Sequence, residues 1–380
     1  MTAKIDTVNV GANALAMQHG APSYWLKSDK VELYLTEEGG QMAPVRFKLK
    51  HRWVSPYALA PWQPDAVDPA LPPVLKLLRG DCFCLPFGPS KAVPWLHGEP
   101  ANLPWSLQRR NVRTLELQRR LDQPQGQITK CIQLKTGQRA VYQEHLLEGL
   151  QGKFNYGHQT ILAFPPAEKG FINTSALRFA QVAPEGFTDP VKGEYSSLKA
   201  CAVFEDLAHV PLATGGTTSL QQFPAREGFE DLVMVINQPD TYAWTAATLG
   251  GYIWFSLKQA KTLPSTLLWF SHGGRHNAPW HGRHRFRVGL QEVNAYFADG
   301  LEASRKNPLS AQGFATAHRF NRRNETRIRL IQAVHPVSKS FGMVVSIEPV
   351  AGAEEVLVTG EKGQRVTVPL SWQFLAGEDH

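Results

Sequence analysis

Hydrophobic and polar residues alternate over short stretches along most of the chain, which is typical of β-strands with one buried face. Pairs of glycines, or clusters of glycine and proline, separate these stretches and favour turns. The pattern therefore predicts many short strands and an all-β protein. The stretches with strand-like character are 31–35, 43–49, 115–118, 128–134, 231–236, 252–257, 344–347 and 356–358.

Helical periodicity is weak, and the best helix candidate is 296–306, which ends before Asn307-Pro308. Two stretches, 53–73 and 184–198, have the composition of long loops. Strand-like sequence of the same kind continues on both sides of each loop, so neither reads as a linker between domains. We found no internal repeat. We expect one large antiparallel β-sandwich domain that spans residues 1–380.

Composition supports a globular protein, because 43% of the 380 residues are hydrophobic and 19% are charged. The formal net charge is +7, but the basic residues are scattered and the arginine pairs stand alone. This distribution disfavours a nucleic-acid surface, which needs a basic stripe or a known module. A mildly basic soluble protein is the simpler interpretation, and attraction to anions such as sugar phosphates is the alternative.

Four cysteines in a chain of this length do not form a disulfide framework, and we expect free thiols. Cys82 and Cys84 are two residues apart, which in a strand places both side chains on one face. The N-terminal segment lacks the apolar run of a signal peptide, and no stretch is long enough to cross a membrane. These features predict a cytoplasmic protein.

Two histidines and one glutamate stand in settings that favour proton transfer. His97 lies in a loop stiffened by prolines and flanked by tryptophans, His158 follows a glycine at the start of a strand-like run, and Glu292 interrupts an apolar run. Imidazole and carboxylate groups can serve as acid and base, and aromatic faces can stack on a sugar ring. Each residue also has a structural alternative: a buried, hydrogen-bonded group with no ligand.

The stretch 269–284 is the densest cluster of chemistry-bearing residues, with Trp269, Arg275 and four histidines. Glycine and proline break any helix that could present a zinc-binding pair, so we expect no metal. We expect instead a loop that places Trp269 and Arg275 beside a ligand, where Arg275 could also receive a phosphate. Arg79 is either the partner of Asp81 in an ion pair or a guanidinium that binds sugar hydroxyls.

No dinucleotide fingerprint, P-loop or nucleophile elbow is present in the sequence. The common cofactor-dependent and nucleophilic chemistries therefore lack their usual signatures. We expect a site without a cofactor.

Five segments together resemble the galactose mutarotase-like superfamily, whose members include aldose 1-epimerases. They occur in the order arginine, first histidine, second histidine, glutamate. The segments are LRGDCFCLPFG (78–88), HGEPANLPW (97–105), GHQTILAFP (157–165), LWFSHGGRHNAPW (268–280) and GLQEVNAYF (289–297).

The resemblance implies a β-supersandwich with its site in a cleft on a concave face. It implies that Arg79 and His97 hold sugar oxygens, that His158 acts as general acid and that Glu292 acts as general base. In this scheme the two groups open the sugar ring and close it again, which interconverts the α and β anomers without a cofactor. The family's additional sugar-binding aspartate has no clear position, and Asp231 is a candidate.

The residues around these motifs depart from those of well-known aldose 1-epimerases, which indicates a divergent branch. The leading hypothesis is a mutarotase that acts on a hexose or related aldose, with a sugar-phosphate epimerase as a variant. The main rival is a protein that binds or senses carbohydrate on the same scaffold without turning it over. A polysaccharide lyase or hydrolase is a third possibility. We expect a small carbohydrate as the partner, and neither nucleic acid nor membrane.

Overall fold

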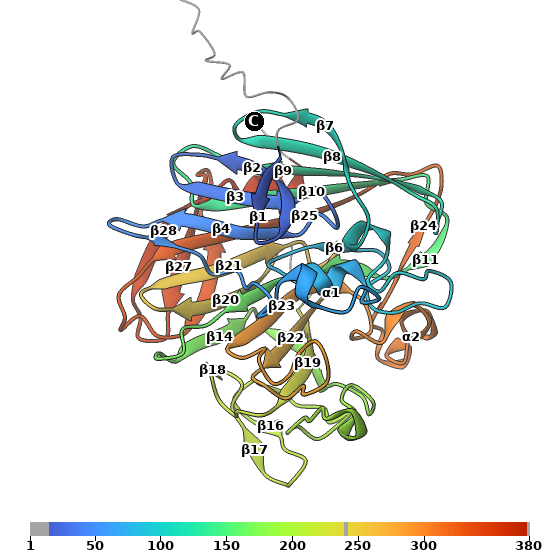
Figure 1. Cartoon of the computed structure of the whole chain (residues 1–380). Coiled ribbons are helices and arrows are strands. Elements are labelled where there is room, and N and C mark those ends of the chain that lie inside the picture. The colour runs from blue at the N-terminus through green and yellow to red at the C-terminus, as the bar shows by residue number, and fades with distance from the viewer. Residues whose placement is uncertain (1–14, 239–241, 378–380) are drawn as a thin grey trace, which may run out of the picture.

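The computed structural model describes residues 15–238 and 242–377 (Figure 1). Every pairing between its strands is antiparallel, as in the register Ala140↔Ala333 of β10 and β25. The all-β fold predicted from the alternating pattern is therefore confirmed. All eight predicted strand stretches fall on strands of the structure.

Two sheets form the main sandwich. The nine-stranded sheet has the order β18 (Gln222–Phe223), β14 (Gly170–Thr174), β20 (Ala243–Leu249), β21 (Tyr252–Lys258), β25 (Thr326–Pro336), β10 (Ala140–Glu148), β9 (Gly126–Gln133), β8 (Thr114–Leu121), β7 (Ser106–Arg110). The seven-stranded sheet has the order β15 (Leu177–Val182), β19 (Glu230–Asn237), β22 (Ser265–Ser271), β23 (Arg287–Asn294), β12 (Tyr156–His158), β6 (Phe83–Cys84), and β13 (Ile161–Ala163) also pairs with β23.

Smaller sheets complete the molecule. The N-terminal sheet contains β1 (Ala16–Gln18), β2 (Ala21–Lys27), β3 (Val31–Thr36), β4 (Met42–Lys48) and β5 (Trp53–Val54), and the C-terminal sheet contains β26 (Val344–Pro349), β27 (Glu355–Gly360) and β28 (Arg365–Pro369). Two short pairs are β11 (Gly152–Phe154) with β24 (His318–Phe320), and β16 (Val210–Pro211) with β17 (Thr217–Thr218).

The largest hydrophobic core fills the space between the two main sheets and continues under the N-terminal sheet. Leu268 and Leu290 of the seven-stranded sheet and Leu330 and Trp254 of the nine-stranded sheet belong to this core. We call the face of the seven-stranded sheet that lines this core its inner face, and the opposite face its outer face. Side chains alternate between the two faces along each strand.

The outer face of the seven-stranded sheet is covered by a second hydrophobic cluster. Leu267, Trp269 and Val293 of the sheet pack there against Trp62 and Trp280, which lie in long connections. A third cluster lies between the nine-stranded sheet and the C-terminal sheet (Figure 1). The nine-stranded sheet is therefore covered on both sides, while the outer face of the seven-stranded sheet is covered by loops.

Helices are short. The predicted helix 296–306 is present as α2 (Gly300–Lys306), which begins four residues later than expected because Tyr296–Asp299 form a turn. Asn307 ends α2 in a left-handed conformation with φ 51°. The other helical segments are α1 (Pro73–Leu77) and 3₁₀ turns at Pro64–Ala66, Glu99–Ala101, Pro190–Lys192, Ser310–Gln312 and Trp372–Ala376.

The four cysteines are free thiols, as predicted. Cys82 and Cys84 are buried on the same face, with their Sγ atoms 3.9 Å apart. In residues 15–238 and 242–377 no helix is long and apolar enough to cross a membrane. The N-terminal residues 1–14, on which the absence of a signal peptide was predicted, lie outside the described residues.

Candidate functional site

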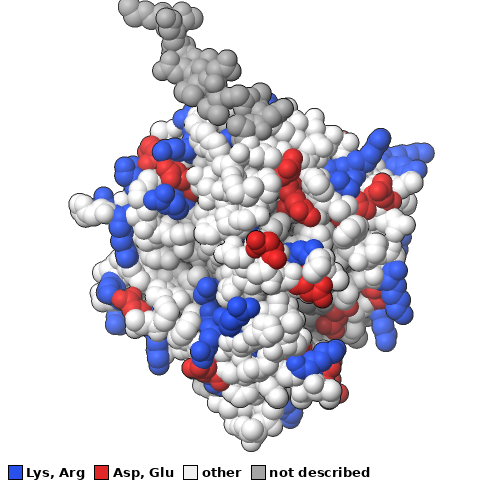
Figure 2. Space-filling model, in the orientation of Figure 1, with Lys and Arg blue, Asp and Glu red and all other residues white. Residues whose placement is uncertain are grey.

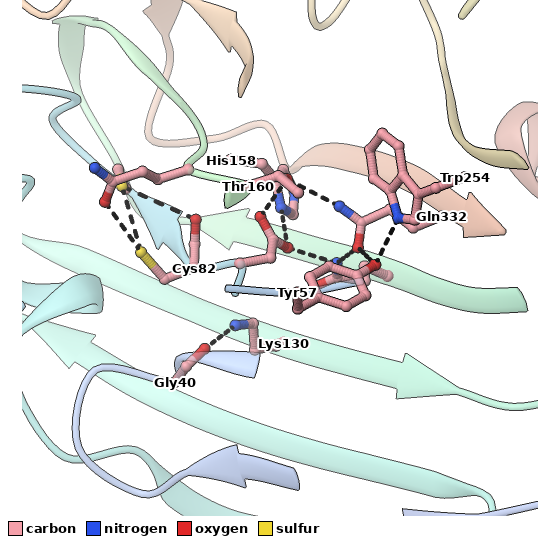
Figure 3. Close-up of polar contacts among 12 residues, drawn as sticks. Gly40, Tyr57, Cys82, Lys130, His158, Thr160, Trp254 and Gln332 are labelled. Atoms are coloured by element: carbon pink, nitrogen blue, oxygen red, sulfur yellow. Dashed lines mark hydrogen bonds and ion pairs between the residues drawn. The ribbon is translucent and has the colours of Figure 1, made fainter. Parts of the chain in front are cut away.

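His158 lies on the inner face of the seven-stranded sheet, in a buried polar network (Figure 3). Its Nδ1 is 3.0 Å from Oδ2 of Asp81, which also accepts a hydrogen bond from Gln143 Nε2 at 2.7 Å. The other carboxylate oxygen accepts a hydrogen bond from Thr160 Oγ1 at 2.8 Å. Burial alone would raise the pKa of Asp81, but the charge and hydrogen bond of His158 hold that pKa below its usual value.

The network continues into the facing sheet. Gln332 Nε2 donates to Thr160 Oγ1 at 2.9 Å, and Tyr57 donates to Gln332 Oε1 at 2.8 Å. Trp254 Nε1 donates to the Tyr57 hydroxyl at 3.2 Å. These contacts join the two sheets through hydrogen bonds inside the core, where an unpaired polar group would be costly. His158 is fully buried, and among the described residues its Nε2 has no hydrogen-bond partner.

Glu292 also points into the space between the sheets. Its Oε1 accepts a hydrogen bond from Ser256 of the facing sheet at 2.7 Å, and its Oε2 accepts one from Thr266 at 2.7 Å. Lys258 Nζ lies 2.5 Å from the same Oε2, and both side chains are fully buried. Burial lowers the pKa of Lys258, and the charge of Glu292 opposes that shift. The carboxylate is therefore paired with a buried ammonium group, and no part of it is exposed.

The residues next to the two predicted catalytic groups face the outer side instead. Gln159 Oε1 lies 3.7 Å from Cys82 Sγ, and Cys82 belongs to the cluster on the outer face. Gln291 lies beside Trp269, since a Cβ on Gly289 would be 2.9 Å from Gln291 Nε2 and 3.1 Å from Trp269 Cβ. On the outer face, the positions next to His158 and Glu292 thus carry the amides of Gln159 and Gln291. Amides do not exchange protons as an acid or a base near neutral pH.

Arg79 and His97 are both engaged by the protein itself. The guanidinium of Arg79 donates to the backbone carbonyls of Leu77, Gln18 and His19, each at 2.9 Å. Burial lowers the pKa of Arg79 to about 10. His97 Nδ1 accepts a hydrogen bond from the Gly88 amide at 3.1 Å, and burial lowers the pKa of His97 to about 4. Both side chains hold loops in place in this structure.

Asp231, the candidate for the family's additional sugar-binding aspartate, holds a loop in place. Its Oδ1 accepts hydrogen bonds from Ser196 Oγ at 2.9 Å and the Ser197 amide at 2.8 Å, and its Oδ2 pairs with Arg226 Nη2 at 2.9 Å. The preceding residue, Glu230, points to the outer face. The sequence offers two adjacent acidic residues here, and only the strand register shows which of them faces the outer side.

Glu230 is the buried carboxylate that sequence reasoning missed. Trp269 Nε1 donates to its Oε2 at 2.8 Å, and Ser271 Oγ donates to its Oε1 at 2.8 Å. Ser271 Oγ is also 2.6 Å from Nδ1 of His284, whose ring stacks on Trp269 with centroids 5.2 Å apart. Burial raises the pKa of Glu230 to about 7, against the attraction of Arg275. A carboxylate of this kind can hold or release a proton near neutral pH.

Arg275 lies among aromatic rings next to this carboxylate. Its guanidinium carbon is 5.1 Å from the Trp280 ring centroid and 5.5 Å from those of Trp269 and Phe187. The structure thus brings Trp269 and Arg275 together, but Trp269 lies on strand β22 and only Arg275 lies in the predicted loop. It keeps them on the opposite side of the sheet from His158 and Glu292.

Three of the four histidines of 272–284 have separate partners. His272 Nδ1 accepts a hydrogen bond from the Phe286 amide at 3.3 Å, His284 contacts Ser271, and His276 lies against Tyr195 with centroids 6.0 Å apart. Within the described part of the chain, no group of three or more His, Cys, Asp or Glu side chains has the geometry to hold a metal ion.

Two hollows on the described part of the chain are lined by none of the six predicted site residues. One has a volume of about 170 Å³ and lies between the N-terminal sheet and α1. The other has a volume of about 690 Å³ and lies at the end of β8 and β9. The outer face of the seven-stranded sheet is instead filled by Trp62, Trp280 and their neighbours.

Comparisons with known proteins identify the fold. No family model matches the chain, and no curated protein matches it in sequence. The galactose mutarotase-like protein from Lactobacillus casei aligns with a TM-score of 0.54 at 10% identity, covering 82% of this chain and 100% of that protein. The galactose mutarotase related enzyme from Lactobacillus acidophilus aligns with a TM-score of 0.53 at 8% identity, covering 83% and 98%.

A protein from Escherichia coli K12, described provisionally as an aldose 1-epimerase, aligns with a TM-score of 0.56 at 12% identity, covering 83% of this chain and 99% of that protein. At this level of identity the likeness establishes the galactose mutarotase-like β-sandwich fold. The fold expected from the sequence resemblance is confirmed.

The Glu292–Lys258 pair predicts a stability effect. Glu292→Gln removes the counter-charge of a buried ammonium group, so we expect the free energy of unfolding to fall by about 3–5 kcal/mol. Urea unfolding followed by circular dichroism measures it. The double variant Lys258→Met/Glu292→Gln removes both charges and should recover much of the loss. A single variant as stable as the wild type would show that Glu292 is not paired in the core.

The raised pKa of Glu230 predicts that the free energy of unfolding depends on pH. A carboxyl group whose pKa rises on folding stabilises the fold at low pH, and this contribution is lost as pH rises through the folded-state pKa. With the pKa raised from 4.5 to about 7, the wild type should lose up to about 3 kcal/mol more than Glu230→Gln between pH 4.5 and pH 7. Urea unfolding across this range tests it, with Glu348→Gln, an exposed carboxylate, as control. An equal change in the free energy of unfolding of wild type and Glu230→Gln over this pH range would contradict the prediction.

Proposed function

We propose that this protein binds a carbohydrate at the edge of the outer face of its seven-stranded sheet and does not use His158 and Glu292 to interconvert anomers. The observation that carries this proposal is the register of β12 and β23. It turns both ionisable groups into the core and leaves Gln159 and Gln291 on the outer face. Gln159 and Gln291 are themselves buried, and amides transfer no protons, so neither position offers a ligand an acid or a base.

The chemistry at the edge of the outer face fits a sugar. Tyr195 is 44% exposed, His276 is exposed, and Phe187 and Arg275 are half-buried. We call these four residues the aromatic rim. Aromatic rings can stack on the apolar faces of a sugar ring, while a guanidinium can donate paired hydrogen bonds to its hydroxyls. Trp269 and Trp280 lie directly behind Arg275 and fix its position.

The fold supports the same ligand class. Two of its structural neighbours are named for galactose mutarotase, whose substrate is a sugar. A binding role on this scaffold requires only the rim and the hydrogen-bonding groups beside it. Catalysis would require, in addition, an acid and a base that both reach the ligand.

A mutarotase remains the second candidate, and Glu230 is the observation that favours it. The carboxyl group of Glu230 faces the outer side, has a pKa of about 7, and is linked through Ser271 to His284. If the protein interconverts anomers, this carboxyl group is the best placed to exchange the proton. A sugar-phosphate substrate would in that case place its phosphate near Arg275.

Saturation-transfer NMR on a panel of aldoses and their 6-phosphates separates these functions. We expect saturation of at least one sugar without faster exchange between its α and β anomers. Accelerated exchange that Glu230→Gln abolishes would establish the second candidate. Accelerated exchange that survives in Glu230→Gln but is lost in a folded Glu292→Gln variant would overturn the proposal.

The aromatic rim makes a separate prediction. Tyr195→Ala removes an exposed ring and should weaken sugar binding roughly 2- to 10-fold, since an aromatic contact contributes about 0.5–1.5 kcal/mol beyond its buried area. Titration calorimetry measures the change in Kd, and Tyr34→Ala on the N-terminal sheet is the matched control. Equal affinity in both variants would move the binding site away from the rim.

A further inference from the structure

The open groove at the end of β8 and β9 is a second place where the chain has the features of a binding site. It has a volume of about 690 Å³, within the range of roughly 300–1,000 Å³ typical of ligand pockets. It lies far along the sequence from the aromatic rim and shares no residue with it. The groove is lined by Arg120, Leu121, Asp122, Gln125, Gly126, Gln127, Glu148, Gly149 and Arg322.

The wall formed by the β8–β9 turn is held rigidly from below. Glu99 is 3% exposed, and its carboxylate accepts hydrogen bonds from the amides of Asp122 at 3.1 Å and Gln123 at 2.9 Å. Arg119 Nη2 pairs with the same carboxylate at 3.3 Å. A turn fastened in this way does not have to be ordered when a ligand binds, which lowers the cost of binding.

Two glycines in the lining of the groove let neighbouring segments of the chain pack closely. A Cβ on Gly126 would lie 2.6 Å from Leu150 Cδ2 and 2.8 Å from the Glu148 carbonyl oxygen, so no side chain fits there. Gly149 faces it, because a Cβ on Gly149 would lie 3.6 Å from Gly126 Cα. Arg322 is positioned on the opposite wall by its amide, which donates to Gln151 Oε1 at 3.1 Å.

The lining is made almost entirely of planar polar side chains. They comprise two guanidinium groups, two carboxylates and two amides: Arg120, Arg322, Asp122, Glu148, Gln125 and Gln127. Gln127 Nε2 donates to Glu148 Oε2 at 3.5 Å. Among the described residues, the side chains of Arg120, Arg322, Asp122 and Gln125 make no hydrogen bond or ion pair, so their donors and acceptors are available.

The charges in the groove balance. Two positive and two negative side chains face the same volume at neutral pH, so neither an anion nor a cation is favoured by net charge. Figure 2 shows basic and acidic side chains side by side at this corner, at the upper right, where β11 and β24 also lie in Figure 1. Each planar group presents two hydrogen-bonding atoms in one plane, which suits a pair of neighbouring hydroxyls.

We infer that this groove is a second binding site, and that its ligand is a short, neutral oligosaccharide. The volume admits more than one sugar ring, the lining supplies donors and acceptors for hydroxyls, and the balanced charge selects against an acidic chain. The inference does not depend on the function proposed for the aromatic rim, because the two sites share no residue.

NMR titration of the full-length protein with maltotriose, cellotriose, mannotriose and trigalacturonic acid tests the inference. At least one neutral trisaccharide should shift the amide signals of Gly126 and Gly149 saturably, and trigalacturonic acid should shift them less. Arg120→Ala and Arg322→Ala should each raise the Kd at least tenfold. Arg323→Ala changes the neighbouring arginine, which does not line the groove, and should leave the Kd within twofold.

Three outcomes would overturn the inference. The first is the absence of shifts at Gly126 and Gly149 with every neutral trisaccharide up to 50 mM. The second is tighter binding of trigalacturonic acid than of any neutral trisaccharide, which would make the groove an anion site. The third is equal loss of binding in Arg323→Ala and Arg120→Ala. Shifts confined to Tyr195 and His276 would support the function proposed for the rim while contradicting the second site.

Discussion

A strand directs successive side chains to opposite faces of its sheet, and this alternation decides which residues of the seven-stranded sheet can meet a ligand. Leu290 and Glu292 share the inner face of β23, and Gln291 takes the outer one. At the end of β12, which pairs with β23, His158 faces inward, and Gln159, which follows β12, faces outward. A shift of one residue in either strand would exchange these roles. The packing of the apolar residues between the sheets prevents such a shift, because it would expose them.

The buried polar groups between the sheets follow from the same constraint. The Glu292–Lys258 pair and the network around Asp81 lie where the sheets face each other, and each joins residues far apart in the chain. A buried ion pair need not add net stability, but breaking it leaves a charge without compensation. We infer that these groups specify how the two sheets fit together. Their presence in the core explains why ionisable residues in short recognisable motifs need not line an active site.

The sequence was sufficient to predict the β-strands, because their alternating pattern is local. It also singled out Trp269 and Arg275, which the structure brings together, although Trp269 lies on strand β22 and not in a loop. It could not assign a face to His158, which stands at the start of a strand-like run, or to Glu292, which interrupts an apolar run, because a polar residue in such a place can face either side of the sheet. Glu230 was missed for a similar reason: it adjoins Asp231, and only the pairing of β19 with β22 shows that Glu230 approaches Trp269 and Ser271. The partners of Arg79 lie in a distant hairpin that no local pattern indicates.

The central claim is that His158 and Glu292 belong to the core and do not touch the ligand. The most direct test is an NMR titration with a sugar that binds, observing the imidazole nitrogens of His158 and the carboxyl carbon of Glu292 beside the indole signals of Trp269 and Trp280. We predict that the indole signals shift with sugar concentration while those of His158 and Glu292 stay unchanged. Saturable shifts of both His158 and Glu292, as large as those of the indoles, would contradict this account.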